Sequence, residues 1–175
     1  MRFGTWNVRS LYRSGSLTTV NRELARYKLD LVGVQEVRWD KEGEVRAGGL
    51  YSFSMEKKRK SLIGNKIFVH HRILSAVKRV EFVSDRMLYI VMRGRWCNII
   101  VLNAHAPSEG EKVSKDSFMR KWNEFLIIFQ GPMKILLIDF KAKLGKDDIF
   151  TPTIWNESLH QDSNDNGARI VNVTT

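Results

Sequence analysis

The sequence predicts an α/β sandwich, in which two mixed β-sheets pack face to face and helices lie outside them. Three features favour this fold class: a strand–helix–strand unit over residues 2–34, a run of short strands over 50–104, and an amphipathic helix before a strand at 133–138. A strand–helix–strand unit predicts a right-handed crossover with parallel pairing. Short strands joined by tight turns predict antiparallel pairing, and the mixture favours sheet-on-sheet packing.

The first unit opens with residues 2–8, which alternate in residue type as a strand does. Residues 14–16 (Ser-Gly-Ser) supply a turn and a helix N-cap. Apolar residues then recur at helical spacing along one face, at Leu17, Val20, Leu24 and Tyr27. Residues 29–34 form a second apolar strand, which ends at Gln35 and Glu36.

Strands and one helix fill the remainder of the predicted domain. The expected strands cover residues 50–55, 66–71, 73–83, 87–93, 97–104 and 133–138. The helix is expected to begin at an N-cap, Ser114, and to end at about Gln130, before Gly131-Pro132. Its apolar stripe comprises Phe118, Trp122, Phe125, Leu126 and Phe129.

The length and composition indicate one packed domain over residues 1–175. The chain is 43% apolar, and 175 residues are enough for a single core. One cysteine excludes a disulfide framework and a cysteine-built zinc site. An apolar segment begins at residue 166 and has nothing to pair with before Thr175, so we expect a domain truncated at its C-terminal end.

The charge indicates a polyanionic partner. The formal net charge is +10 and the pI is about 9.9, which attracts nucleic acid, although a generically basic domain is the alternative.

The N-terminus has no apolar signal segment and no run is long enough to span a membrane, so we expect neither secretion nor a membrane. A nuclear location is expected, otherwise a cytoplasmic one. The basic cluster 57–60 is an import signal, a phosphate contact or a solvated hairpin turn. Nothing in the sequence indicates an oligomeric state.

Two acids, Glu36 and Asp139, come directly after strongly apolar strands. A sheet brings strand ends to one edge, where the ligand sites of open α/β sheets lie. Carboxylates with open positions suit Mg²⁺, which polarises phosphoryl oxygens, and a second carboxylate can orient or deprotonate water. Asn7, also at a strand end, can hold a ligand or water through its amide. The alternative is that these acids only cap loops.

Other polar residues follow the same strand ends. His105 comes after the strand 97–104, where an imidazole can donate to a phosphate oxygen or act as acid or base. The alternative is a loop histidine bonded to the backbone. Arg9, Ser10 and Arg38 follow the strands that carry Asn7 and Glu36, so we expect them to rim the same edge and contact the phosphate backbone of a nucleic acid.

Four motifs together resemble the endonuclease/exonuclease/phosphatase superfamily in order and spacing. They are Thr5-Trp6-Asn7-Val8, Gln35-Glu36-Val37, Ala104-His105-Ala106-Pro107 and Asp139-Phe140-Lys141-Ala142. Residues 6–11, 22–39, 77–87 and 94–96 resemble more closely the apurinic-type endonuclease domain of LINE-like retrotransposons of the RTE type. The resemblance runs through nearly all 175 residues.

This resemblance implies a four-layer α/β sandwich that cuts phosphodiester bonds in DNA with Mg²⁺ or Mn²⁺. It implies that Glu36 binds the metal and that Asn7 supports the same centre. Asp139 would position or activate the attacking water. His105 stands where many members have a phosphate-contacting tyrosine.

The sequence departs from the family pattern at three places. Ile138 replaces a glycine expected at a tight turn, and Lys141 replaces an asparagine. Lysine only donates hydrogen bonds, so Lys141 could bind phosphate, repel the metal or pair with Asp139. The family's later aspartate and terminal Ser-Asp-His segment have no counterpart before Thr175.

Three functions therefore remain open from the sequence. The first is a divalent-metal endonuclease that nicks DNA. The second is a catalytically inactive relic that serves as a basic nucleic-acid-binding or protein-interaction domain. The third is a phosphatase for a small phosphoester, against which the basic charge argues.

Overall fold

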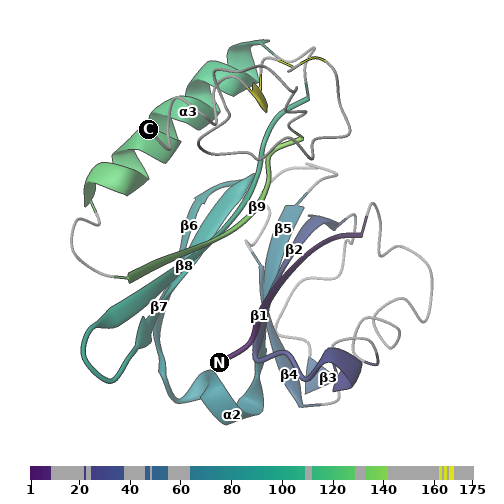
Figure 1. Cartoon of the computed structure of the whole chain (residues 1–175), viewed down its shortest axis with the longest axis vertical. Coiled ribbons are helices and arrows are strands. Elements are labelled where there is room, and N and C mark those ends of the chain that lie inside the picture. Colours follow the sequence, from purple (N-terminus) through teal and green to yellow (C-terminus); the bar gives the residue numbers. More distant parts are fainter. Residues whose placement is uncertain are drawn as a thin grey trace.

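The fold consists of two mixed β-sheets packed face to face, as predicted (Figure 1). A computed structural model describes residues 1–8, 22, 25–37, 46–47, 49–54, 64–108, 112–128, 133–141, 162, 164 and 166–167. The first sheet has the order β1-β2-β5-β4-β3 and the second has the order β6-β7-β8-β9. The first sheet contains β1 (Phe3–Asn7), β2 (Leu31–Val37), β3 (Arg46–Ala47), β4 (Leu50–Ser54) and β5 (Gly64–His70). The second contains β6 (Val77–Ser84), β7 (Met87–Arg93), β8 (Asn98–His105) and β9 (Met133–Asp139).

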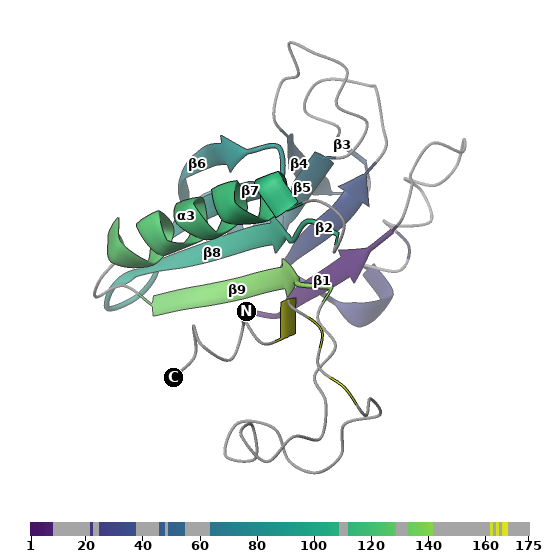
Figure 2. The ribbon, with the colours of Figure 1, turned by 90° about the horizontal axis from the view of Figure 1, so that it is seen from above.

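Each sheet contains one parallel pair of strands. β1 runs parallel to β2 with Asn7 opposite Gln35, and β8 runs parallel to β9 with His105 opposite Asp139. The other pairings are antiparallel, and the short turns predicted those between β4 and β5, β6 and β7, and β7 and β8. Figure 2 shows β1 and β9 next to each other, and the two strands are in contact. The two parallel pairs therefore end close to one another.

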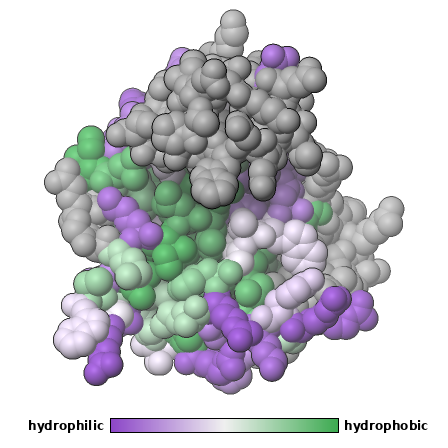
Figure 3. Space-filling view, in the orientation of Figure 1, coloured by the Kyte–Doolittle hydropathy of each residue, from purple (hydrophilic) through white to green (hydrophobic). Residues whose placement is uncertain are grey.

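Apolar side chains fill the space between the two sheets. Those buried from the first sheet are Leu31, Ile67 and Val69, and those from the second are Leu88, Ile90, Met92, Val101 and Leu137. On the face of the molecule seen in Figure 1, Figure 3 shows hydrophobic residues across the middle and hydrophilic residues along the lower edge. Strand alternation places every second side chain in this interior, so the register is fixed by burial.

The helix α3 (Lys112–Ile128) covers the outer face of the second sheet (Figure 2). Phe118, Trp122 and Phe125 are buried there against residues of β7 and β8, as the predicted apolar stripe requires. The helix already includes Lys112, so Ser114 lies inside it and is not its N-cap. Within the described residues, no helix is long and apolar enough to cross a membrane.

The predicted helix over 17–27 lies mostly outside the described residues. Residues 22 and 25–27 are helical, and Tyr27 is exposed, although the periodicity placed it on the apolar face. Val32, Val34 and Phe68 form a buried cluster with Val37 and Leu50, against which Val8 and Leu29 pack.

The strand predicted over residues 73–83 is wrong at its start. Residues His71–Leu74 form a short helix, α2, and the strand β6 begins at Val77. The cause is local: the His70 side chain accepts a hydrogen bond of 3.2 Å from the backbone N–H of Arg72, which caps a helical turn. This turn carries the chain from the first sheet to the second.

A buried polar contact joins the two sheets within the apolar interior. Gln35 Nε2 donates to Asn103 Oδ1 at 2.6 Å, and Asn103 Nδ2 donates to the carbonyl of Lys66 at 2.9 Å. Both amide side chains are fully buried. Gly33 makes the approach possible, because a Cβ at this position would lie 2.8 Å from Asn103 Oδ1 and 3.1 Å from Leu137 Cβ.

We predict that Gly33→Ala destabilises the protein by about 2–3 kcal/mol, because Asn103 is held by its hydrogen bonds and cannot yield to the added methyl group. Gly4→Ala is the matched control. Its Cβ would also meet an atom at 2.8 Å, but that atom is the terminal Cδ1 of Leu29, which can rotate away. Urea unfolding followed by tryptophan fluorescence measures both. Equal midpoints for the two variants would contradict the assignment.

Candidate metal centre

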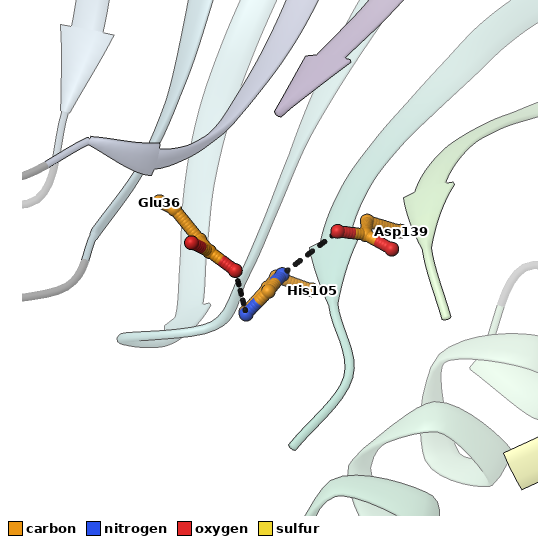
Figure 4. A group of neighbouring side chains, drawn as sticks. All are labelled: Glu36, His105 and Asp139. Carbon is orange, nitrogen blue, oxygen red and sulfur yellow. Dashed lines mark ion pairs between the residues drawn. The ribbon is translucent and has the colours of Figure 1, made fainter. Parts of the chain in front are cut away.

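Four polar side chains meet where β1, β2, β8 and β9 end: Asn7, Glu36, His105 and Asp139. The three that carry ionisable groups each offer one ligand atom, and these atoms lie within 4.8 Å of one another. Figure 4 shows the carboxylates of Glu36 and Asp139 pointing toward the His105 ring from opposite sides. The structure thus brings these sequence-predicted residues together from both sheets.

Glu36 reaches this cluster through an unusual backbone conformation. Its φ is 56°, in the left-handed region, and the pairing of β2 with β5 is irregular between Val34 and Val37. A left-handed conformation costs a non-glycine residue about 1–2 kcal/mol. The irregularity re-aims one side chain, as β-bulges do, while the neighbours Gln35 and Val37 remain buried. Glu36 itself stays partly exposed, at 14% of its side chain.

His105 lies between the two carboxylates and is 1% exposed. Its Nε2 is 3.5 Å from Glu36 Oε1, and its Nδ1 is 3.6 Å from Asp139 Oδ2. The Nδ1 atom is buried and has no hydrogen-bond partner among the described residues. The alternative of a loop histidine bonded only to backbone does not describe this ring, since both of its nitrogens face carboxylates.

Asp139 is held by three neighbouring groups. Asn7 Nδ2 donates to its Oδ2 at 2.5 Å, and the backbone N–H of Lys141 donates to its Oδ1 at 3.0 Å. The adjacent His105 ring lowers the pKa of Asp139 most. Burial opposes this shift, but the hydrogen bonds from Asn7 and Lys141 reinforce it, so the pKa of Asp139 lies well below its usual range. Asp139 is therefore ionised at neutral pH.

The Lys141 ammonium lies 2.8 Å from Glu36 Oε1. Burial alone would raise the pKa of Glu36, but the hydrogen bonds from Lys141 and Asn7 outweigh it and lower the pKa below its ordinary value. A pair between Lys141 and Asp139 is one of three roles that the sequence leaves open. That role is wrong for the side chain, because only the backbone of Lys141 contacts Asp139 and the ammonium contacts Glu36.

The expectation of a tight turn at Ile138 is also wrong. Ile138 lies within β9, opposite Ala104, and packs against the cluster beneath α3. A branched side chain suits such a strand position. The turn residue is Lys141, whose φ is 48°.

Two asparagines that the sequence reasoning missed support the loops of the site. Asn166 Nδ2 donates to the carbonyls of Pro107 and Phe140, at 3.2 and 3.0 Å, and so joins the segments that follow β8 and β9. Asn164 Nδ2 donates to the carbonyl of Lys141 at 3.0 Å. The signal was present as the turn sequence Asn-Asp-Asn-Gly at 164–167. The predicted rim residues Arg9, Ser10 and Arg38 lie outside the described residues.

The donor set fits a divalent cation. The ionised carboxylates of Glu36 and Asp139, with the amide oxygen of Asn7, are the oxygen ligands that Mg²⁺ and Mn²⁺ prefer. Nδ1 of His105 adds a buried polar atom that has no hydrogen-bond partner within the part of the chain that the structure describes. Among the described residues, the Lys141 ammonium lies against Glu36, and a metal bound to Glu36 must displace it or bind beside it.

Comparison with known sequences finds a curated relative of low identity but no matching family model. No model of a known protein family matches the chain. The craniofacial development protein 2 of Bos taurus is 26% identical over 148 residues, which are 83% of this chain and 25% of that protein. The chain thus spans about a quarter of the length of this curated relative.

Comparison with solved structures decides the fold. The endonuclease domain of TRAS1, a telomere-specific non-LTR retrotransposon, superposes with a TM-score of 0.64 at 14% identity, over 96% of this chain and 66% of that one. The AP endonuclease LMAP of Leishmania major gives 0.60 at 13% identity, over 82% and 55%. The chain has the endonuclease/exonuclease/phosphatase fold.

Proteins of this fold are not all nucleases. The 2′,3′-cyclic phosphatase ANGEL2 superposes with a TM-score of 0.57 at 14% identity, over 85% of this chain and 54% of that one. The same fold thus occurs in proteins named as endonucleases and in one named as a phosphatase.

We predict that Asp139→Asn lowers stability at pH 7 by about 1–2 kcal/mol, because it removes a charge that three neighbouring groups stabilise. The folded-state pKa lies below the ordinary value of 3.8, so this contribution is present above pH 3.8 and is lost as the pH falls toward the folded-state pKa. Urea unfolding from pH 7 down to pH 3 measures the difference between variant and wild type.

The matched control is Asp85→Asn, in the exposed turn between β6 and β7. We expect it to change stability by less than about 0.5 kcal/mol at either pH. If the Asp139→Asn variant equals the wild type at pH 7, or if the difference does not begin to shrink as the pH falls below 3.8, Asp139 does not carry the stabilised charge.

Proposed function

We propose that this protein is a divalent-metal-dependent phosphodiesterase of endonuclease type that acts on DNA. The observation that supports it most is the convergence of Glu36, His105 and Asp139 within 4.8 Å at the joined ends of two sheets. Two ionised carboxylates beside an imidazole suit the hydrolysis of a phosphodiester, in which a cation and hydrogen-bond donors face the phosphate. Hydrolysis joins a water oxygen to phosphorus and breaks one ester bond, leaving a hydroxyl and a phosphate monoester.

Glu36 and Asn7 would hold Mg²⁺ or Mn²⁺, and the ion would polarise a phosphoryl oxygen. Asp139 orients the attacking water through its carboxylate, and its low pKa makes it a hydrogen-bond acceptor rather than a strong base. Asn7 fixes the Asp139 carboxylate by its hydrogen bond of 2.5 Å. His105 donates a hydrogen bond to a phosphate oxygen. Because the ring is buried, water does not compete for this hydrogen bond.

DNA is the substrate that the charge favours. The net charge of +10 attracts a polyanion, and Arg9, Ser10 and Arg38 follow strands that end at the site, so they would contact phosphates. The fold neighbours TRAS1 and LMAP are endonucleases by name. A retrotransposon origin and a nuclear location agree with this substrate, and we include both in the proposal.

A plasmid-nicking assay tests the proposed reaction. We expect the wild type to convert supercoiled plasmid to the open circle with Mg²⁺ or Mn²⁺ and to lose this activity with EDTA. Glu36→Gln and Asp139→Ala should each lower the rate by about 100-fold or more, because each removes a charge at the reacting phosphate. Glu81→Gln, on the distant strand β6 where Glu81 pairs with Arg79, should nick at the wild-type rate. Equal nicking by all four proteins would contradict the assignment.

A second candidate is an inactive relic that binds nucleic acid without cutting it. The ion pair between Lys141 and Glu36, at 2.8 Å, favours this alternative, because an internal cation already neutralises the proposed metal ligand. The same plasmid distinguishes the two functions. If the protein binds the plasmid in a salt-sensitive way but does not nick it at any concentration of Mg²⁺ or Mn²⁺, the inactive relic is the correct function.

A further inference from the structure

Lys141 is held in a fixed position by its own backbone. Its φ of 48° lies in the left-handed region, its N–H donates to Asp139 Oδ1 at 3.0 Å, and its carbonyl accepts from Asn164 at 3.0 Å. The Asp139 carboxylate therefore forms an Asx-turn, in which it accepts a hydrogen bond from the backbone N–H two positions later. The direction of the Lys141 side chain follows from this turn and not from a flexible surface loop.

The fixed backbone directs the ammonium across the joined edge of the two sheets. Its Nζ lies 2.8 Å from Oε1 of Glu36, which belongs to the other sheet. The Lys141 side chain is 34% exposed, whereas that of Glu36 is only 14% exposed. Partial burial strengthens such a pair relative to one in bulk water, because solvent screens it less. Glu36 is also in the left-handed conformation, so two unusual backbone positions serve this one contact.

Glu36 Oε1 also lies 3.5 Å from His105 Nε2. It therefore faces the centre of the proposed metal site. An ammonium at 2.8 Å from this atom fills space that a metal bound there needs. Two cations on one carboxylate oxygen repel each other, and this repulsion is strong where water is partly excluded.

We propose that Lys141 is an internal cation that competes with the divalent metal for Glu36 and so sets the metal concentration at which the site fills. This inference rests on the divalent-metal requirement of the proposed function. Metal binding moves the ammonium away from Glu36, and the released ammonium faces the same side as the substrate phosphate. The protein is then unable to hold the metal tightly when metal is scarce.

Mn²⁺ binding, measured from the free-ion signal in electron paramagnetic resonance, tests the competition without any cleavage reaction. Lys141→Met keeps most of the side-chain stem and removes the charge. We expect it to bind Mn²⁺ roughly tenfold more tightly than the wild type, since the competing cation is gone. Lys141→Arg keeps the charge and should stay within about threefold of the wild type.

Lys134→Met controls for the overall loss of one positive charge. Lys134 lies on β9 and donates to the carbonyl of Leu126, away from the strand ends that form the site. Its Mn²⁺ affinity should stay within about twofold of the wild type, because a distant surface charge is screened. Adding Glu36→Gln to Lys141→Met should abolish the gain, which assigns the bound ion to Glu36. Thermal unfolding verifies that each variant is folded, and Lys141→Gln replaces the methionine variant if that variant is not.

The competition is overturned if Lys141→Met binds Mn²⁺ no more tightly than the wild type, if neither protein binds it, or if the gain survives Glu36→Gln. Its failure differs from that of the proposed function. Tighter Mn²⁺ binding by Lys141→Met, with no nicking by any variant, would uphold the competition and refute the endonuclease.

Discussion

The hydrogen bond of 2.6 Å between Gln35 and Asn103 is the contact on which the rest of the structure depends. It lies in an interior that is otherwise apolar, and Gly33 leaves the room for it. Gln35 Nε2 also lies 2.8 Å from Thr5 Oγ1 and 3.3 Å from the carbonyl of Leu137. One side chain of β2 thus contacts β1, β8 and β9, and a relative shift of the sheets would leave buried polar groups unpaired at a cost of about 1–3 kcal/mol each.

This alignment explains why the site residues meet. Asn7, His105 and Asp139 each lie two positions after a residue of that contact, and strand alternation therefore places them on the same face of their strands as that contact. Glu36 follows Gln35 by only one position, so a regular strand would turn it away. Its left-handed φ of 56° corrects the direction. The strained backbone conformation of Glu36 is thus needed to bring a second carboxylate into the cluster.

The sequence predicted the strands, the sandwich and the four residues that converge, because alternation and strand ends are local signals. The strand over 87–93 has the predicted bounds. Periodicity could not show that Lys141 pairs with Glu36, since that contact depends on how two sheets meet and on two left-handed residues. The family motif implied a turn at Ile138, whereas the predicted strand over 133–138 already contained this residue, and the structure holds it in β9. The α2 turn was missed because a histidine cap has no clear signal in a run of apolar residues.

The central claim is that the joined strand ends form one divalent-cation site. Crystals soaked in Mn²⁺ and measured at a wavelength where manganese scatters anomalously test it most directly. The account predicts an anomalous peak within bonding distance of the Glu36 carboxylate, with the Lys141 ammonium moved from its place 2.8 Å from Oε1. A crystal saturated with Mn²⁺ that shows no peak at Glu36, with the ion pair intact, would contradict it.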